Sequence, residues 1–143
     1  MRKLSMTIVA FILVTFGVQG MSHFAINVEH FAAIEFMRPK PIMVLGFTVM
    51  IIQALIIGVV MLRLYPDGAT LKQAISVSAS FGIFLGSYIA LTEPAKYAAP
   101  SIPAWIIVEG TASFIQFALF GVLLSLIYRK STASTATLGD AAV

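Results

Sequence analysis

The side chains that could do chemistry lie near one predicted end of a very apolar chain. The opposite end is basic. Ionisable groups near hydrocarbon are costly, so a cluster of them marks a place where something is bound, relayed or held in register. The residue types alone do not choose between these three roles. The cluster consists of carboxyl and imidazole groups, namely His23, Glu29, His30, Glu35, Glu93 and Glu109.

Glu109 is the most informative single residue. It follows Pro103 by six residues, which places it about 9 Å below the predicted start of its helix at a rise of about 1.5 Å per residue. An unpaired charge at that depth costs about 2–3 kcal/mol or more, so we expect the carboxyl to be paired or neutral. Lys96 is the nearest expected cation, and Tyr88 is expected at a similar depth. Three alternatives remain open: a Glu109–Lys96 pair that only fixes helix register, a ligand, ion or proton site, and a catalytic carboxylate.

Two glutamines form a deeper polar feature. By helical rise, Gln53 and Gln116 lie about 17 and 20 Å below the same predicted surface, so we expect their amides to meet across the bundle. Glu109, Ser113 and Gln116 share one helical face and form a polar stripe. A structural hydrogen bond is favoured over a polar pathway, and both remain open.

The two histidines raise the question of a metal site. His23, Asn27 and His30 recur at i, i+4 and i+7, which is one helical face. Imidazole and carboxylate groups suit zinc or iron, with Glu29 or Glu35 as further candidate ligands. Two histidines at this spacing are more often ordinary interfacial side chains, so we predict no metal site. The sequence contains no Gly-rich phosphate loop, nucleophile elbow or HExxH motif, and it identifies no cofactor.

The composition predicts a membrane protein. Of the 143 residues, 59% are hydrophobic and 10% are charged, and the mean hydropathy is +0.99. A soluble domain carries about a quarter charged residues, so this chain could not cover a soluble surface. The net charge of +3 is too sparse for nucleic-acid binding. The absence of cysteine excludes disulfides, thiolate metal sites and cysteine nucleophiles.

Four apolar runs are expected to form membrane-spanning helices, because each approaches or exceeds the roughly 20 residues that cross about 30 Å of hydrocarbon. Irregular backbone cannot face lipid, which favours helices throughout. For the first run, a signal peptide cleaved after Gly20 is the alternative, but the apolar character resumes with Met21 and Phe24, which favours a retained span. The runs cover residues 4–24, 42–62, 71–91 and 103–128.

Basic residues set the predicted orientation. Six of the nine lysines and arginines fall on the side of the N-terminus and three fall in the opposite loops, so the positive-inside rule places both termini in the cytoplasm. We predict one four-helix transmembrane domain over residues 1–130 and a disordered cytoplasmic tail over 131–143. Aromatic residues expected at the membrane interfaces are Tyr65, Tyr97, Trp105 and Tyr128.

Local signals predict how the helices are joined and packed. Pro66 and Gly68 predict a tight turn between the second and third spans, and Ser101 predicts an N-cap for the fourth. Small residues at four-residue spacing let helix backbones approach closely, and packing within the monomer is favoured over a homodimer seam. These small residues are Ser78, Gly82 and Gly86 on the third span and Gly121 and Ser125 on the fourth.

The third and fourth spans carry a family resemblance. The residues 84–90 (FLGSYIA), 93–97 (EPAKY), Pro100-Ser101, Trp105, Glu109-Gly110 and Gln116-Phe117, together with Gln53 and Tyr65-Pro66, resemble DUF1761-like proteins, which are small four-helix bacterial inner-membrane proteins of unknown function. The similarity covers roughly residues 38–128. It implies a polytopic helical fold and transfers no activity and no site residue.

We therefore predict an all-α, polytopic integral membrane protein of a bacterial inner membrane, with four transmembrane helices in an up-down bundle. The leading function is a non-enzymatic accessory or small-ligand-binding protein with an outward-facing polar pocket. A small oligomeric transporter with Glu109 as coupling carboxylate and an intramembrane enzyme acting on an apolar substrate are the alternatives. The expected partners are the lipid bilayer and either further copies of the chain or a membrane protein. The predicted ligand-binding residues are Gln53, Tyr88, Glu93, Lys96, Glu109 and Gln116.

Overall fold

The computed structural model describes residues 1–38 and 40–130, and the predicted tail over 131–143 lies outside them. The described chain is almost entirely helical, and its only β-type pairing is an isolated bridge between Ala69 and Arg129. Four helical segments are long and apolar enough to cross a membrane, which confirms the predicted all-α fold with four candidate spans. These segments are Arg2–Ile26, Met43–Leu64, Leu71–Lys96 and Ile102–Ile127.

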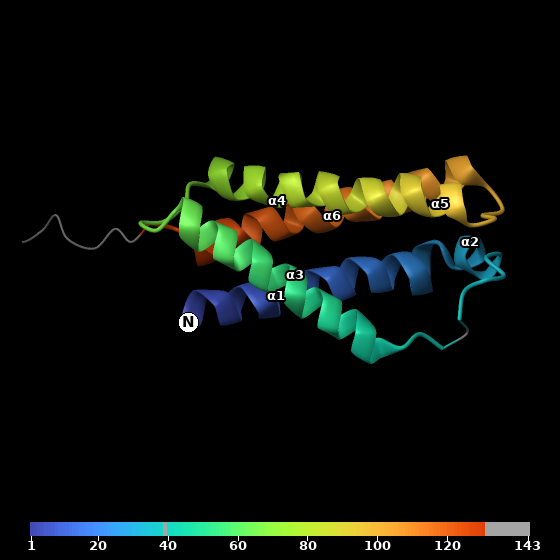
Figure 1. The fold of residues 1–143 in the computed structure, drawn as a ribbon, viewed down its shortest axis with the longest axis horizontal. Helices are drawn as coiled ribbons and strands as arrows, with labels where there is room; N and C mark the ends of the chain where they lie inside the picture. Colours follow the sequence, from blue (N-terminus) through green and yellow to red (C-terminus); the bar gives the residue numbers. More distant parts are fainter. Residues whose placement is uncertain (39, 131–143) are drawn as a thin grey trace, which may run out of the picture.

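The helices run up and down, and the start of the chain lies at the same end of the bundle as the end of the last helix (Figure 1). Helices α4 and α6 lie side by side, while α1 packs against both α6 and α3. The helices in chain order are α1 (Arg2–Met21), η1 (Ser22–Ile26), α2 (Val28–Ala32), α3 (Met43–Leu64), α4 (Leu71–Ser87), η2 (Tyr88–Thr92), α5 (Glu93–Lys96) and α6 (Ile102–Ile127), where η marks a π-helical turn.

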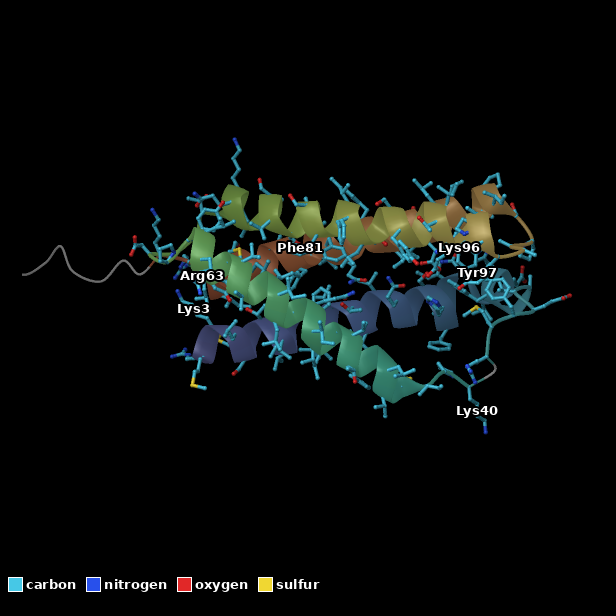
Figure 2. All side chains as sticks on the ribbon, in the orientation of Figure 1. Lys3, Lys40, Arg63, Phe81, Lys96 and Tyr97 are labelled. Atoms are coloured by element: carbon cyan, nitrogen blue, oxygen red, sulfur yellow. The ribbon has the colours of Figure 1, made fainter. Side chains whose placement is uncertain are left out.

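Two ends of the bundle are distinguished below. The turn end holds Met1, the connection over residues 65–70 and Arg129, and the loop end holds the connections over residues 33–42 and 97–101. In Figure 2, Lys3 and Arg63 lie at the turn end, and Lys40, Lys96 and Tyr97 lie at the loop end.

Local sequence signals fix where the helices begin. Thr70 forms a capping box with Gln73, in which the Thr70 hydroxyl accepts from the Gln73 backbone and the Gln73 side chain accepts from the Thr70 N–H. Ser101 caps α6 by accepting from the Ala104 N–H, as predicted. Gly68 has a φ of 107°, which L side chains rarely adopt, and this confirms the predicted turn.

The turn end is closed by the fully buried side chain of Tyr128. Its hydroxyl lies 3.0 Å from Thr7 Oγ1 and donates to the Gly58 carbonyl at 3.3 Å, while its own carbonyl accepts from the Ala69 N–H at 2.7 Å. These contacts tie α1, α3 and the 65–70 turn to the end of α6. Tyr128 follows directly on the candidate span Ile102–Ile127, as the interfacial prediction expects, but its hydroxyl is satisfied inside the protein.

Small residues bring α4 and α6 into close contact. A Cβ added at Gly82 would lie 2.8 Å from Phe117 Cβ, and one at Gly121 would lie 3.1 Å from Ser78 Cβ. The Ser78 hydroxyl donates to the Phe117 carbonyl at 2.6 Å. The small-residue faces therefore pack within the monomer, which confirms that interpretation.

The loop end is more open. Residues 41–49, which include the first seven residues of α3, are all exposed, and Met50 is the first buried residue of this helix. Figure 1 shows α3 diverging from α4 toward this end. The first span continues through η1 and then bends at Asn27, whose φ and ψ are −112° and 32° and whose amide donates to Ser22 Oγ at 3.0 Å.

Candidate functional site

A cavity of about 690 Å³ occupies the loop half of the bundle, between α1, α3, η2 and α6. Its volume falls within the usual range of small-ligand sites, about 300–1,000 Å³. The polar side chains on its wall are Thr15, Gln19, His23, Gln53, Glu93, Glu109, Ser113 and Gln116, and the aromatic ones are Phe31, Phe36, Tyr97, Trp105 and Phe117.

Glu109 faces this cavity from the middle of the loop half. Its side chain is buried, with only 6% exposed, and within the described residues no hydrogen bond or ion pair engages its carboxyl. Buried polar groups are normally paired, and buried charges almost always are. The carboxyl oxygens of Glu109 are not enclosed by protein, so they are open to the cavity and available to a ligand there.

The predicted Glu109–Lys96 pair is wrong. Lys96 is exposed, its Nζ donates to the Tyr88 hydroxyl at 3.3 Å, and the ammonium lies 5.3 Å from the centre of the Tyr88 ring. Tyr88 and Lys96 lie outside the cavity, so the expectation that they line it is also wrong. Tyr88 begins the π-helical turn η2 and Lys96 follows it, so the regular α-helical spacing on which the prediction depended does not hold between them.

Glu93 lies on the other face of the same segment and lines the cavity. It is half-buried and lies on the same wall as Glu109. The two glutamates are the only acidic residues on the wall, and no lysine or arginine lies on it, although Lys96 acts on Glu93 electrostatically from outside the cavity. Of the predicted set, Gln53, Glu93, Glu109 and Gln116 therefore share one wall, and Tyr88 and Lys96 do not lie on it.

The amide of Gln116 is held by α1. Gln116 Oε1 accepts from Gln19 Nε2 at 2.9 Å, and Gln116 Nε2 donates to Thr15 Oγ1 at 3.0 Å. The predicted Gln53–Gln116 hydrogen bond is therefore wrong, although Gln53 lines the same cavity. The reason is the order of the helices, since α1 packs against both α3 and α6 and reaches Gln116 first.

Sequence reasoning missed the contribution of the first span. Thr15, Gln19 and His23 recur every four residues in an otherwise apolar run, and all three line the cavity. The His23 Nδ1 lies 2.9 Å from the Gln19 carbonyl, which can only accept, so Nδ1 carries the proton and Nε2 is the acceptor in a neutral ring. The four-residue polar spacing was the signal that could have revealed this stripe.

Trp105, which was expected at the membrane interface, lies in the first turn of α6, and its side chain is buried against the cavity with 5% exposed. Its indole N–H donates to the Ile89 carbonyl at 3.1 Å. This carbonyl needs a side-chain donor because the Glu93 N–H bonds Tyr88 instead and Pro94 has no N–H. The indole thus stabilises the π-helical turn that places Glu93 on the wall.

The two histidines have different surroundings. His23 stacks on Phe31 with 3.7 Å between ring centres, whereas His30 lies beside Trp105 and its buried Nε2 has no hydrogen-bond partner. Glu29 and Glu35 are both exposed. Across residues 1–38 and 40–130, no group of three or more potential ligands is placed to hold a metal ion.

The comparisons with known proteins give no match: no family model fits the chain, and neither a curated protein nor a solved structure is similar to it. The resemblance to DUF1761-like proteins stays a prediction. The functional argument therefore depends on the geometry of the cavity alone.

Proposed function

We propose that this protein is a non-enzymatic membrane protein that binds a small ligand in the cavity of its loop half. One observation carries the proposal: Glu109 is only 6% exposed, and its carboxyl opens onto the cavity without a hydrogen-bond partner among the described residues. Leaving such a group unpaired in a membrane protein is costly unless it serves a ligand, an ion or a proton. Gln53 and Ser113 on the same wall add hydrogen-bonding groups for orientation.

The cavity is proposed to open away from the cytoplasm. Six of the nine basic residues belong to the turn end, which supports a cytoplasmic position for both termini in a bacterial inner membrane. Reporter fusions after Lys72 and Lys130 are expected to be cytoplasmic, and a fusion after Lys96 is expected to be external. The opposite pattern would reverse the direction in which the cavity opens.

Binding is favoured over transport because the turn end offers no polar continuation of the cavity. There the aromatic rings of Phe11 and Phe120 pack edge to face at 4.8 Å, and Phe11, Phe120, Leu124 and Tyr128 are all fully buried. A transporter with Glu109 as its coupling group would have to open this packing in every cycle. An enzyme would need an acid–base pair aimed at one reacting atom, and no hydrogen bond links Glu109 to another described residue.

Native mass spectrometry of the protein extracted from its own membrane tests the proposal. The wild type is expected to carry a small molecule that Glu109→Gln loses, while the variant folds with equal or greater thermal stability because a buried carboxyl has been neutralised. Glu29→Gln is the matched control, since Glu29 is exposed and lies off the cavity wall. Retention of the same molecule by Glu109→Gln, or its absence from all three proteins, would contradict the proposal.

A further inference from the structure

We infer that the ligand is an amphiphilic organic cation, with its positive group beside Glu109 and Glu93 and its hydrocarbon tail in a second chamber between α1 and α3. This inference rests on the proposed function, because it names the class of ligand for the same cavity. Three features carry it: the sign of the charges on the wall, the aromatic side chains around them, and the adjoining apolar space.

The charges on the wall favour a cation. Glu93 and Glu109 lie on the same wall, no basic residue lies on it, and Lys96 acts from outside the cavity on Glu93 rather than on Glu109. A bound anion would add a third negative charge in a region of low dielectric, where such repulsion is strong. A single positive group beside the two carboxyls removes the unpaired charge and satisfies Glu109 at the same time.

The aromatic side chains favour an organic cation over a metal ion. Trp105 and Tyr97 come from α6 and the connection before it, and Phe31 and Phe36 come from α2 and the connection after it, so the acidic wall is flanked from two sides. Aromatic faces attract ammonium groups within about 6 Å, with Trp the strongest. A small metal ion would instead need several oxygen or nitrogen ligands converging on one point.

The second chamber favours a hydrocarbon tail. It has a volume of about 790 Å³ and shares Thr15, Gln19, His23, Phe31, Met37 and Met50 with the first cavity, so the two adjoin. Beyond these shared residues its wall is mainly apolar and includes Phe16, Phe24, Ile34 and Met43, with the charged pair Glu35 and Arg38 on the part formed by the first connection. It lies where the exposed start of α3 departs from the bundle, which gives a tail direct access to the lipid.

The single tryptophan of the chain reports on the site, because Trp105 lies on the cavity wall. The protein in phosphatidylcholine nanodiscs is titrated with octyltrimethylammonium, with tetramethylammonium, and with uncharged N-octylacetamide. We expect a saturable change of Trp105 fluorescence with octyltrimethylammonium and a much weaker one with N-octylacetamide. Glu109→Gln is expected to weaken binding of the cation by about tenfold or more, because the quaternary ammonium, which has no N–H, loses its ion pair with the carboxylate.

Two glycine variants test where the tail lies. Gly46 lies on the wall of the second chamber and Gly17 lies in a lipid-facing groove between α1 and α6, and neither has an atom within 4 Å of an added Cβ. Gly46→Leu is expected to weaken the binding of octyltrimethylammonium and to leave the binding of tetramethylammonium unchanged. Gly17→Leu, the matched control, is expected to change neither. Glu93→Gln provides a second charge variant if Glu109→Gln folds poorly.

The outcomes separate this inference from the proposed function. If N-octylacetamide binds as tightly as octyltrimethylammonium and its binding also depends on Glu109, the ligand need not be a cation, but the ligand site itself is supported. A Gly46→Leu protein that binds octyltrimethylammonium as the wild type does would overturn the placement of the tail. Two outcomes are possible if no probe changes the fluorescence. A molecule that the wild type carries and Glu109→Gln loses in native mass spectrometry would overturn the cationic ligand but not the proposed binding function. The absence of such a molecule would overturn both the cationic ligand and the binding function.

Discussion

The two halves of the bundle are built from the same four spans, yet they differ in how their polar groups are used. At the turn end, each hydroxyl of the Thr7–Tyr128 pair is bonded within the protein, and the surrounding rings of Phe11 and Phe120 leave no space. At the loop end, Glu109 faces a cavity of about 690 Å³ without a partner. The comparison indicates that one half supplies stability and that the other is free to supply a site.

The difference originates in the packing of α4, η2 and α3. Gly82 and Gly121 bring α4 against α6 along the turn half, whereas beyond Ser87 the π-helical turn and Pro94 interrupt the regular pattern. On the opposite side, α3 leaves the bundle before Met50. Because the helices are closely packed at the turn end, the loop half can remain open without loss of the overall fold. Segments that form binding sites are commonly less stable than the core.

The largest expected effect comes from truncating a tyrosine at each end. Tyr128→Ala removes a fully buried ring and two hydrogen-bonded contacts, so we expect a loss of about 3–5 kcal/mol in the free energy of unfolding. Tyr97→Ala at the loop end removes a half-exposed ring and should cost less than about 1 kcal/mol. Thermal unfolding in one detergent measures both, and equal losses would break the distinction between the two ends.

A pair of glycine substitutions sharpens the comparison at the level of helix contacts. Gly82→Ala forces Phe117 or the α4 backbone to move, and overpacking of this kind costs about 1–3 kcal/mol. Gly46→Ala meets no atom within 4 Å and gains helix propensity, so it should be neutral or stabilising by up to about 1 kcal/mol. Destabilisation by Gly46→Ala and not by Gly82→Ala would show that the exposed start of α3 is packed.

Part of this contrast could be predicted from the sequence. Hydropathy was sufficient to predict the four candidate spans. Gly68 was sufficient to predict the turn between the second and third spans, and Ser101 was sufficient to predict the N-cap of the fourth. Helical rise predicted similar depths for Gln53 and Gln116, and both line the cavity that Glu109 faces. These features follow from composition and helical rise, which do not depend on tertiary contacts.

The wrong predictions concern the direction in which side chains point and the helix that packs beside them. The side chains of Tyr88 and Lys96 lie outside the cavity, in a segment where the π-helical turn η2 replaces regular α-helix, and no propensity marks such a turn. The partner of Gln116 depends on which helix packs beside α6, which periodicity does not encode. Trp105 is buried because Pro94 leaves the Ile89 carbonyl without a backbone donor, a relation between two different helices.

The smallest expected effect concerns the amides that border the cavity. A double-mutant cycle of Gln19→Leu and Gln116→Leu should give a coupling of about 0.6 kcal/mol, the typical value for a hydrogen bond between membrane helices. The same cycle with Gln53→Leu and Gln116→Leu should give a coupling near zero, because their amides are not bonded. A larger coupling for the second pair would mean that α3 is closer to α6 than α1 is.

Cysteine accessibility tests the central claim most directly, because the chain has no native cysteine to interfere. Ser113→Cys puts a thiol on the cavity wall, and Ser78→Cys puts one in the closed α4–α6 contact, although both serines are buried. In nanodiscs, where both faces are exposed, a cationic water-soluble thiol reagent should modify Ser113→Cys at least about tenfold faster, a difference of about 1.4 kcal/mol in barrier. Equal rates at the two positions, or modification of Ser78→Cys alone, would contradict an open loop half above a sealed turn end.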